Sequence, residues 1–192
     1  PVTAAPMVLQ PVELADMVCG PPGDGSASDF NFRETFHITE DSDFQDVHEL
    51  RDAFWEVVDT MMVQEKWGLL LFITGVRRLP PPKTELMAIE LQYMPPEARA
   101  GSNRSASASD AAQSLLGRVP CAHTCDNVLE VPDYWTALVT EAGFDPKRGL
   151  PASAKLMGDL RQKLRKHLRD KLLLAIANAQ GYGLDGISSS MG

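Results

Sequence analysis

The chain has 192 residues, of which 44% are hydrophobic and 23% charged, so it is long enough to bury a core without disulfides or metal. Its formal net charge of -8 argues against a nucleic-acid binder, because contacts to phosphates need a basic surface. No apolar run approaches the ~20 residues that cross a bilayer, so we expect neither nucleic acid nor membrane as a partner.

The first part of the chain predicts two helices after stretches without regular structure. Residues 1–12 are apolar but punctuated by proline, and residues 20–28 have the composition of a flexible connector. From His48 to Met62, apolar residues recur at helical spacing, and Trp67 to Ile73 predicts a second helix. Gly75 follows in a position suited to a left-handed cap.

The middle of the chain predicts two strands and a loop. Met87 to Tyr93 alternates apolar or aromatic residues with others, as a strand does. Arg99 to Ala112 is of low complexity and predicts a mobile loop, to which we assign no chemistry. Thr124 to Val131 predicts a second strand, which Pro132 ends.

The last part of the chain predicts two helices, Asp133 to Ala142 and Ser153 to Ala179. Ser153 is a candidate N-cap for the longer one, and Gly181 is a stop signal. The apolar residues of this helix recur at four-residue steps, at Leu156, Leu160, Leu164, Leu168, Leu172 and Ile176. Together the elements predict a small α/β or α+β domain with few strands.

The cysteines are odd in number and unevenly placed, at Cys19, Cys121 and Cys125. This usage suits a reducing compartment better than a disulfide framework, so we expect a cytoplasmic protein, with the nucleus as the alternative. The chain begins with Pro1 and lacks the pattern of a signal peptide, so we expect a monomeric fragment of a longer protein.

The segment Val119–Pro132 concentrates the reactive side chains. On an extended backbone, Cys121, His123 and Cys125 would share one face. A thiolate is a strong nucleophile, and a nearby imidazole or backbone dipole can activate it for acyl transfer. On local features alone, a small buried cysteine is the commoner outcome.

Zinc binding is another interpretation of the same three residues. A structural zinc site normally draws on two ligand pairs separated by a loop. The other candidates form no second pair at a standard spacing; they are Cys19, His37, His48 and His167. We therefore expect no metal site.

Five segments, in this order, resemble motifs of one family. They are Glu13–Gly20, Phe54–Val58 (FWEVV), Leu69–Pro80 (LLLFITGVRRLP), Pro120–Cys125 (PCAHTC) followed by Asn127, Leu129 and Pro132, and Lys171–Leu184 (KLLLAIANAQGYGL). The set resembles the C-terminal catalytic lobe of HECT-type ubiquitin ligases, in a divergent form. The resemblance implies an α+β fold in which helices surround a small sheet.

The resemblance also implies a domain organisation. Residues 1–44 would hold the end of the HECT N-lobe and the hinge between the lobes. Residues 45–192 would form the C-lobe, with a flexible tail at 185–192. The rest of the N-lobe, which recruits the conjugating enzyme, would be missing.

The activity that the resemblance implies is a two-step acyl transfer through Cys125. The cysteine would take ubiquitin from a charged conjugating enzyme as a thioester, and a lysine of a substrate protein would then attack that thioester. The implied partners are ubiquitin, the charged conjugating enzyme and the protein substrate. The implied chemistry needs no cofactor at this lobe.

We expect supporting roles for four further residues. His123 would stabilise the thiolate or the oxyanion, or else fix the loop through the backbone. Thr124 would donate a hydrogen bond to the thioester carbonyl, or simply favour extended backbone. Asn127 holds the loop through side-chain-to-backbone bonds, and Tyr182 occupies the position of the family's tail aromatic, as a ligation residue or a packing anchor.

Asp126 departs from the family, which usually has phenylalanine after the nucleophile. A carboxylate here repels a neighbouring thiolate, but it can also attract or deprotonate an incoming lysine ammonium. We hypothesise that Asp126 assists the second step, with a solvated loop residue as the alternative.

An insertion at 134–168 is the second departure, because the family joins these elements by a short loop. It carries most of a basic run, which is the solvated face of a helix or a surface for an acidic partner. The run consists of Lys155, Arg161, Lys163, Arg165, Lys166, Arg169 and Lys171.

Two other functions stay open on the sequence. The departures at Asp126 and 134–168 are compatible with a non-catalytic interaction module that kept the fold. A thiol hydrolase is a third option, but no distant histidine and aspartate in a motif-like context support it.

Overall fold

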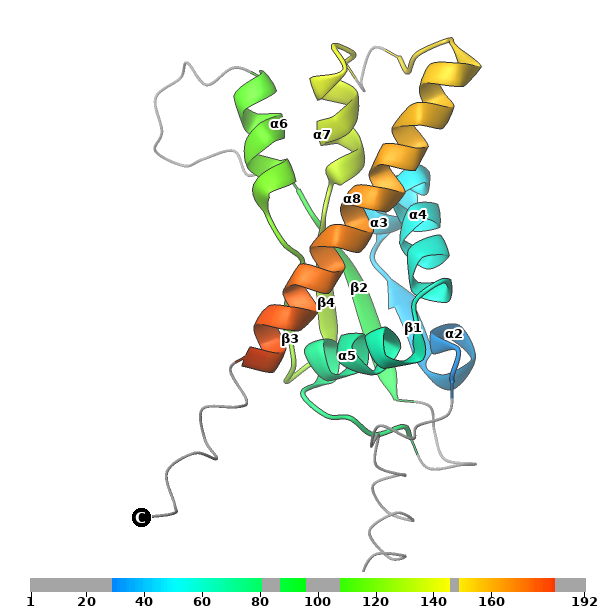
Figure 1. Cartoon of the computed structure of the whole chain (residues 1–192), viewed down its shortest axis with the longest axis vertical. Coiled ribbons are helices and arrows are strands. Elements are labelled where there is room, and N and C mark those ends of the chain that lie inside the picture. The colour runs from blue at the N-terminus through cyan, green and yellow to red at the C-terminus, as the bar shows by residue number, and fades with distance from the viewer. Residues whose placement is uncertain (1–28, 81–86, 96–107, 146–148, 182–192) are drawn as a thin grey trace, which may run out of the picture.

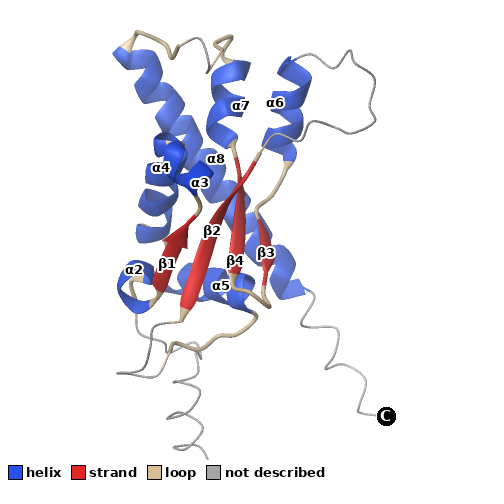
Figure 2. Ribbon diagram, turned by 180° about the vertical axis from the view of Figure 1, so that it is seen from behind, coloured by secondary structure: helices blue, strands red, loops and turns tan. Residues whose placement is uncertain are grey.

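A four-stranded sheet forms the centre of the protein, seen in a computed structural model that describes residues 29–80, 87–95, 108–145 and 149–181. The strands are β1 (His37–Glu40), β2 (Ala88–Met94), β3 (Cys121–His123) and β4 (Val128–Pro132), in the spatial order β1-β2-β4-β3. In this order β1, β2 and β4 run parallel to one another, whereas β3 runs antiparallel to β4. A short hairpin therefore forms one edge of the sheet (Figure 2).

The helices pack mainly on one face of this sheet and beyond one of its ends. They are α2 (Phe32–Thr35), α3 (Ser42–Asp46), α4 (His48–Asp59), α5 (Val63–Thr74), α6 (Ala108–Gly117), α7 (Tyr134–Glu141) and α8 (Ala154–Gly181). Figure 1 shows α8 and α5 in front of the strands, with α6 and α7 at the upper end. This mixed arrangement agrees with the α+β class predicted from the sequence.

The long helix α8 supplies one side of the core. Five of the six apolar residues predicted at four-residue steps are buried: Leu160, Leu164, Leu168, Leu172 and Ile176. Leu156 is partly buried and packs against the same core. The predicted cap is also present, since the Ser153 hydroxyl oxygen accepts the amide of Leu156 at 3.4 Å. The four-residue pattern thus identified the buried stripe correctly.

The basic run on α8 forms ion pairs with the neighbouring helices. Three arginines at four-residue intervals each meet a glutamate of α4 or α5: Arg161–Glu49 at 3.5 Å, Arg165–Glu56 at 2.9 Å and Arg169–Glu65 at 2.8 Å. Part of the positive charge is therefore neutralised inside the fold. These ion pairs account for Arg161, Arg165 and Arg169, three of the seven residues of the run.

The core extends further toward the N-terminus than the predicted domain boundary after residue 44. Phe30, Phe36 and Phe44 are buried together with residues of α4 and α5. Lys66 of α5 is also buried and forms an ion pair with Asp29 at 2.8 Å. The described residues before 45 therefore pack in the same core as α4 and α5.

The helix predicted at Trp67–Ile73 is longer than expected. It begins at Val63, because the Glu65 carboxylate accepts the amide of Met62 at 2.8 Å and closes the first turn. At the other end Gly75 adopts φ 73°, which confirms the predicted left-handed cap, and its amide donates to the carbonyl of Leu71.

The loop predicted at Arg99–Ala112 ends in a helix. Residues 108–112 form the start of α6, where Ala112 and Leu115 pack against Ala137 of α7. Serine and alanine gave the stretch its low complexity, but alanine is also the best helix former once tertiary contacts are available. Residues 99–107 lie outside the described residues.

The first strand was absent from the prediction, and so were the short helices beside it. The side chains of β1 alternate only between exposed and partly buried positions. Its four residues therefore lack the apolar alternation by which a strand is recognised in a sequence. Its position comes from pairing with β2, in which His37 lies opposite Ala88. Such a strand is defined by its neighbour rather than by its own sequence.

The predicted insertion at 134–168 is part of the core rather than an appendage. It contributes α7 and the first half of α8, in which Tyr134, Leu160 and Leu164 are buried.

None of the helices in the described part of the chain combines the length and apolar character needed to span a membrane.

Candidate functional site

Cys125 lies in the turn that joins β3 to β4, not within a strand. The predicted strand at Thr124–Val131 is wrong in its first four residues, because residues 124–127 form the turn and the strand begins at Val128. The amide of Asp126 donates to the carbonyl of His123 at 3.1 Å and closes this turn. Cys125 is exposed, as are Thr124 and Asp126.

Asn127 fixes the exit of the turn. Its φ of 55° places it in the left-handed region, which asparagine tolerates better than most residues. Its carbonyl accepts the amide of Glu90 at 3.1 Å, and its side-chain amide donates to the carbonyl of Ala88 at 3.3 Å. The bond to Ala88 is of the side-chain-to-backbone type expected for this residue, and the bond to Glu90 joins two backbone groups.

Thr124 places the entrance of the turn beside the cap of α5. A Cβ atom placed on Gly75 would lie 3.6 Å from the Cβ of Thr124, so the two residues are neighbours. The cap predicted from the sequence and the turn that carries Cys125 are therefore neighbours. The sequence gave no sign of this contact, because the two residues are far apart along the chain.

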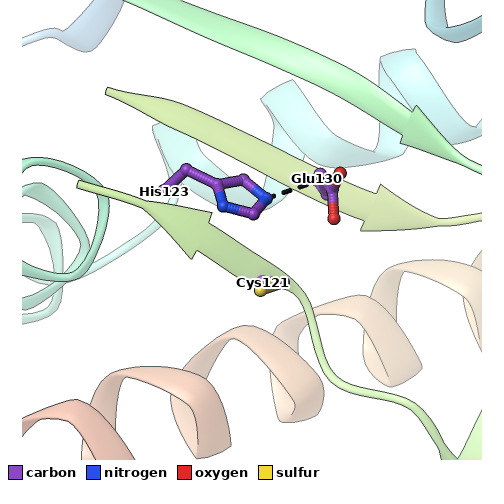
Figure 3. Close-up of side chains that lie close together, drawn as sticks. All are labelled: Cys121, His123 and Glu130. Atoms are coloured by element: carbon purple, nitrogen blue, oxygen red, sulfur yellow. Dashed lines mark ion pairs between the residues drawn. The ribbon is translucent and has the colours of Figure 1, made fainter. Parts of the chain in front are cut away.

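The expected shared face of Cys121, His123 and Cys125 is only partly correct. Cys121 and His123 alternate with Ala122 on β3 and point to the same side, whereas Cys125 lies in the turn beyond the end of the strand. The residue that joins the first two is Glu130 of β4, whose Oε1 lies 3.5 Å from Nε2 of His123 (Figure 3). Sequence reasoning missed Glu130.

The far end of β4 is held by a buried carboxylate. Asp133 accepts the hydroxyl of Tyr93 at 2.7 Å and also caps α7 by accepting the amide of Thr136 at 2.9 Å. Burial and then this carboxylate raise the pKa of Tyr93 well above its ordinary value, which keeps the phenol protonated as a donor. The hairpin is therefore anchored at both ends of β4.

Several predicted features lie outside the described residues. They are Cys19 and the motif around it, the connector at 20–28, Tyr182 and the tail at 185–192.

Comparison with known proteins adds two findings. A family model described as "HECT-domain (ubiquitin-transferase)" matches residues 3–142, which is more than half of the chain and includes the whole β3–β4 hairpin. The chain is also 31% identical, over 142 residues, to an E3 ubiquitin-protein ligase of Caenorhabditis elegans, hecw-1. That alignment covers 74% of this chain but only 8% of the relative.

Proposed function

The chain belongs to the HECT family of ubiquitin-transferases, and from that premise we propose that Cys125 is its ubiquitin-accepting nucleophile. The chain would then act as the catalytic C-lobe of a ubiquitin-protein ligase. The family match includes Cys125 and the residues on both sides of it. It ends before Lys171–Leu184, so the resemblance of the closing helix to the family stays a prediction.

The position of Cys125 is the observation that carries this proposal. The residue is exposed, yet its turn is bonded to β2 through Asn127 and lies against Gly75 through Thr124. A nucleophile that reacts with a protein-bound thioester needs open access from solvent. It also needs a fixed backbone, since the exchange of one thioester for another has little driving force and depends on positioning.

The chemistry has two balanced steps. In the first, the Cys125 thiolate attacks the carbonyl carbon at the C-terminus of ubiquitin, and the thiolate of the conjugating enzyme leaves. In the second, the amine of a substrate lysine attacks the new thioester, loses a proton and expels the Cys125 thiolate. The product is an amide, so the second step runs downhill.

The supporting residues divide into positioning and chemical roles within this proposal. Asn127 positions the turn through its bonds to β2. Thr124 positions it against Gly75, and its hydroxyl is a candidate donor to the thioester carbonyl. His123 lies 3.5 Å from Glu130 of the adjacent strand β4 and stays a candidate for stabilising the thiolate or the oxyanion. Tyr182 is retained as a candidate for the ligation step by its position in the sequence.

The partners belong to the same proposal. The chain spans about 8% of the length of the curated relative that it matches. Ubiquitin and the protein substrate would meet at the Cys125 turn. Recruitment of the conjugating enzyme would depend on regions outside the C-lobe, as the family resemblance implies.

A thioester-trapping experiment tests the role of Cys125. The full-length protein is mixed with ubiquitin-charged conjugating enzyme and quenched without reductant. We expect a ubiquitin adduct that dithiothreitol removes and that Cys125→Ala abolishes. Cys121→Ala is the matched control, since Cys121 is also exposed and lies on the same hairpin, and this variant should keep the adduct.

Two results would overturn the proposal. An adduct that persists in Cys125→Ala would assign the nucleophile to another residue. No adduct in the parent, under conditions where a known HECT ligase forms one, would instead favour a non-catalytic interaction module.

A further inference from the structure

Three side chains with metal-binding atoms converge on the β3–β4 hairpin. They are Cys121, His123 and Glu130, and their candidate ligand atoms all lie within 4.8 Å of one another. Figure 3 shows the imidazole of His123 directed toward Glu130, with Cys121 farther along the same strand. The group lies outside the turn that carries Cys125.

The strand register explains why these residues meet. Cys121 is directly opposite Glu130 in the antiparallel pair, and His123 is two residues from Cys121 on the same side of β3. Their neighbours Ala122 and Leu129 face the helices and pack in the core. The three candidate ligands therefore project from the other face of the sheet, where Cys121 and His123 are exposed and Glu130 is partly exposed.

The spacing suits a tetrahedral metal ion. In zinc sites the bonds are about 2.3 Å to sulfur and about 2.0 Å to nitrogen or oxygen, so ligand atoms lie roughly 3.5 Å apart. Nε2 of His123 and Oε1 of Glu130 are already 3.5 Å apart. The thiol needs to approach by only about 1 Å, which a small side-chain rotation of an exposed residue supplies.

The donor set also selects the class of metal. A thiolate, an imidazole and a carboxylate together match Zn²⁺, and they match Ca²⁺ or Mg²⁺ poorly because those ions take oxygen ligands. The His123–Glu130 contact is long and half exposed, so little is lost when a metal takes its place.

We propose that Cys121, His123 and Glu130 form a Zn²⁺-binding site with water as the fourth ligand. On the sequence alone, we set aside a zinc site at Cys121, His123 and Cys125 because no second ligand pair accompanies them. The hairpin places Cys125 in the turn, apart from the other two. In the proposed site the third protein ligand is Glu130 and not Cys125. The Cys125 thiol therefore stays unligated and available for reaction. The observations behind the site do not depend on the function proposed for Cys125, although the two share His123.

Metal titration of the reduced full chain tests the site. Zn²⁺ affinity is measured by competition with a chromophoric chelator, and Co²⁺ serves as the spectroscopic probe of a tetrahedral site with a thiolate ligand. We expect one ion per chain. Cys121→Ser and Glu130→Gln should each weaken binding by at least about tenfold. Loss of a residue that only hydrogen-bonds to a metal ligand already lowers metal affinity by about that factor.

Matched controls separate this site from general thiol binding. Cys125→Ser and Cys19→Ser should bind Zn²⁺ with the affinity of the parent. The affinity should also fall as the pH falls, because protons compete for the thiolate and the imidazole. Circular dichroism of each variant verifies that its fold is retained.

Cysteine alkylation followed by peptide mass spectrometry gives a second measurement. Zn²⁺ should slow the alkylation of Cys121 and leave the rate at Cys125 unchanged. Equal affinity in the parent, Cys121→Ser and Glu130→Gln would overturn the proposal. Loss of binding in Cys125→Ser, or protection of Cys125 by the metal, would overturn it as well.

Discussion

At the residue scale, the turn between β3 and β4 places a carboxylate directly after the proposed nucleophile. Asp126 is exposed, and its backbone amide closes the turn by donating to the carbonyl of His123. Its side chain is therefore accessible to an incoming amine. A carboxylate in this position repels the thiolate, yet it attracts a lysine ammonium or takes its proton.

Discharge kinetics test the hypothesis that Asp126 assists the second step. In the full-length protein, preformed Cys125–ubiquitin is mixed with free lysine in a single turnover. Asp126→Ala should slow discharge by about a hundredfold, which is at the low end for loss of a general base. Asp126→Asn should behave in the same way, because it keeps the size and removes the charge.

A control variant removes a carboxylate elsewhere. Asp159→Ala takes an exposed charge from α8 and should discharge at the parental rate. If Asp126→Ala discharged ubiquitin at the parental rate across the pH range, Asp126 would be an ordinary solvated residue with no part in the second step.

At the scale of elements, the cap of α5 and the β3–β4 turn support each other. Gly75 ends the helix with φ 73° and lies against Thr124, while Asn127 bonds to β2 on the other side of the turn. The backbone on both sides of Cys125 is thus held by elements distant in sequence. The left-handed conformation at Gly75 is the part of this arrangement that depends most on residue type.

Substitution of Gly75 tests this dependence. Gly75→Ala should lower the free energy of unfolding by about 1 kcal/mol, because an L-residue is strained at positive φ. The added Cβ meets Thr124 at 3.6 Å, an ordinary contact distance, so the cost comes from the backbone rather than from a clash. Urea denaturation gives the free energy.

Gly158 is the matched control, since it lies inside α8 with open space around it. Gly158→Ala should raise the free energy of unfolding by about 0.5–1 kcal/mol, through helix propensity. A Gly75→Ala variant as stable as the parent would show that the cap does not need glycine.

At the scale of the whole molecule, α8 connects the helices on one face of the sheet. Its arginines pair with α4 and α5, and its His167 lies against α7 and α6, with the ring of Tyr134 at 4.7 Å and a hydrogen bond to the backbone of Leu116. Nε2 of His167 is buried without a hydrogen-bond partner. A proton at this nitrogen would therefore be poorly solvated.

This environment predicts a pH-dependent stability of the whole fold. Burial, and then the charge of Lys171, hold the pKa of His167 below its ordinary value of 6.5, against the opposing effects of the Leu116 backbone, Asp170 and Glu141. Above that value, His167 is neutral in both the folded and the unfolded states and has no effect. As the pH falls below it, the unfolded chain binds a proton that the folded protein resists, so stability declines.

Substitution of the histidine separates its contribution. The parent should lose stability to urea between pH 7 and about pH 5.5, and His167→Gln should lose less over this range. His48→Gln, at an exposed position on α4, should follow the parent. Identical pH profiles for the parent and His167→Gln would contradict the prediction.

Local patterns in the sequence were enough for the longer elements. The four-residue apolar step of α8, the alternation in β2 and the left-handed cap at Gly75 each depend on residues close together in the chain. The ordered motifs around Cys125 were enough to suggest the family that the comparison later matched. The prediction missed β1, β3 and α6, because these elements are stabilised by neighbours that the sequence does not place.

The sequence by itself thus determined the family, the long helices and Cys125 as the candidate nucleophile. Only the tertiary structure decided the surroundings of that residue: the turn that presents it, the contact between Thr124 and Gly75, and the position of Glu130 opposite Cys121. The physical reason is the range of the interactions. Periodicity and capping act over a few residues, whereas strand register and helix–turn contacts are set by the packing of distant segments.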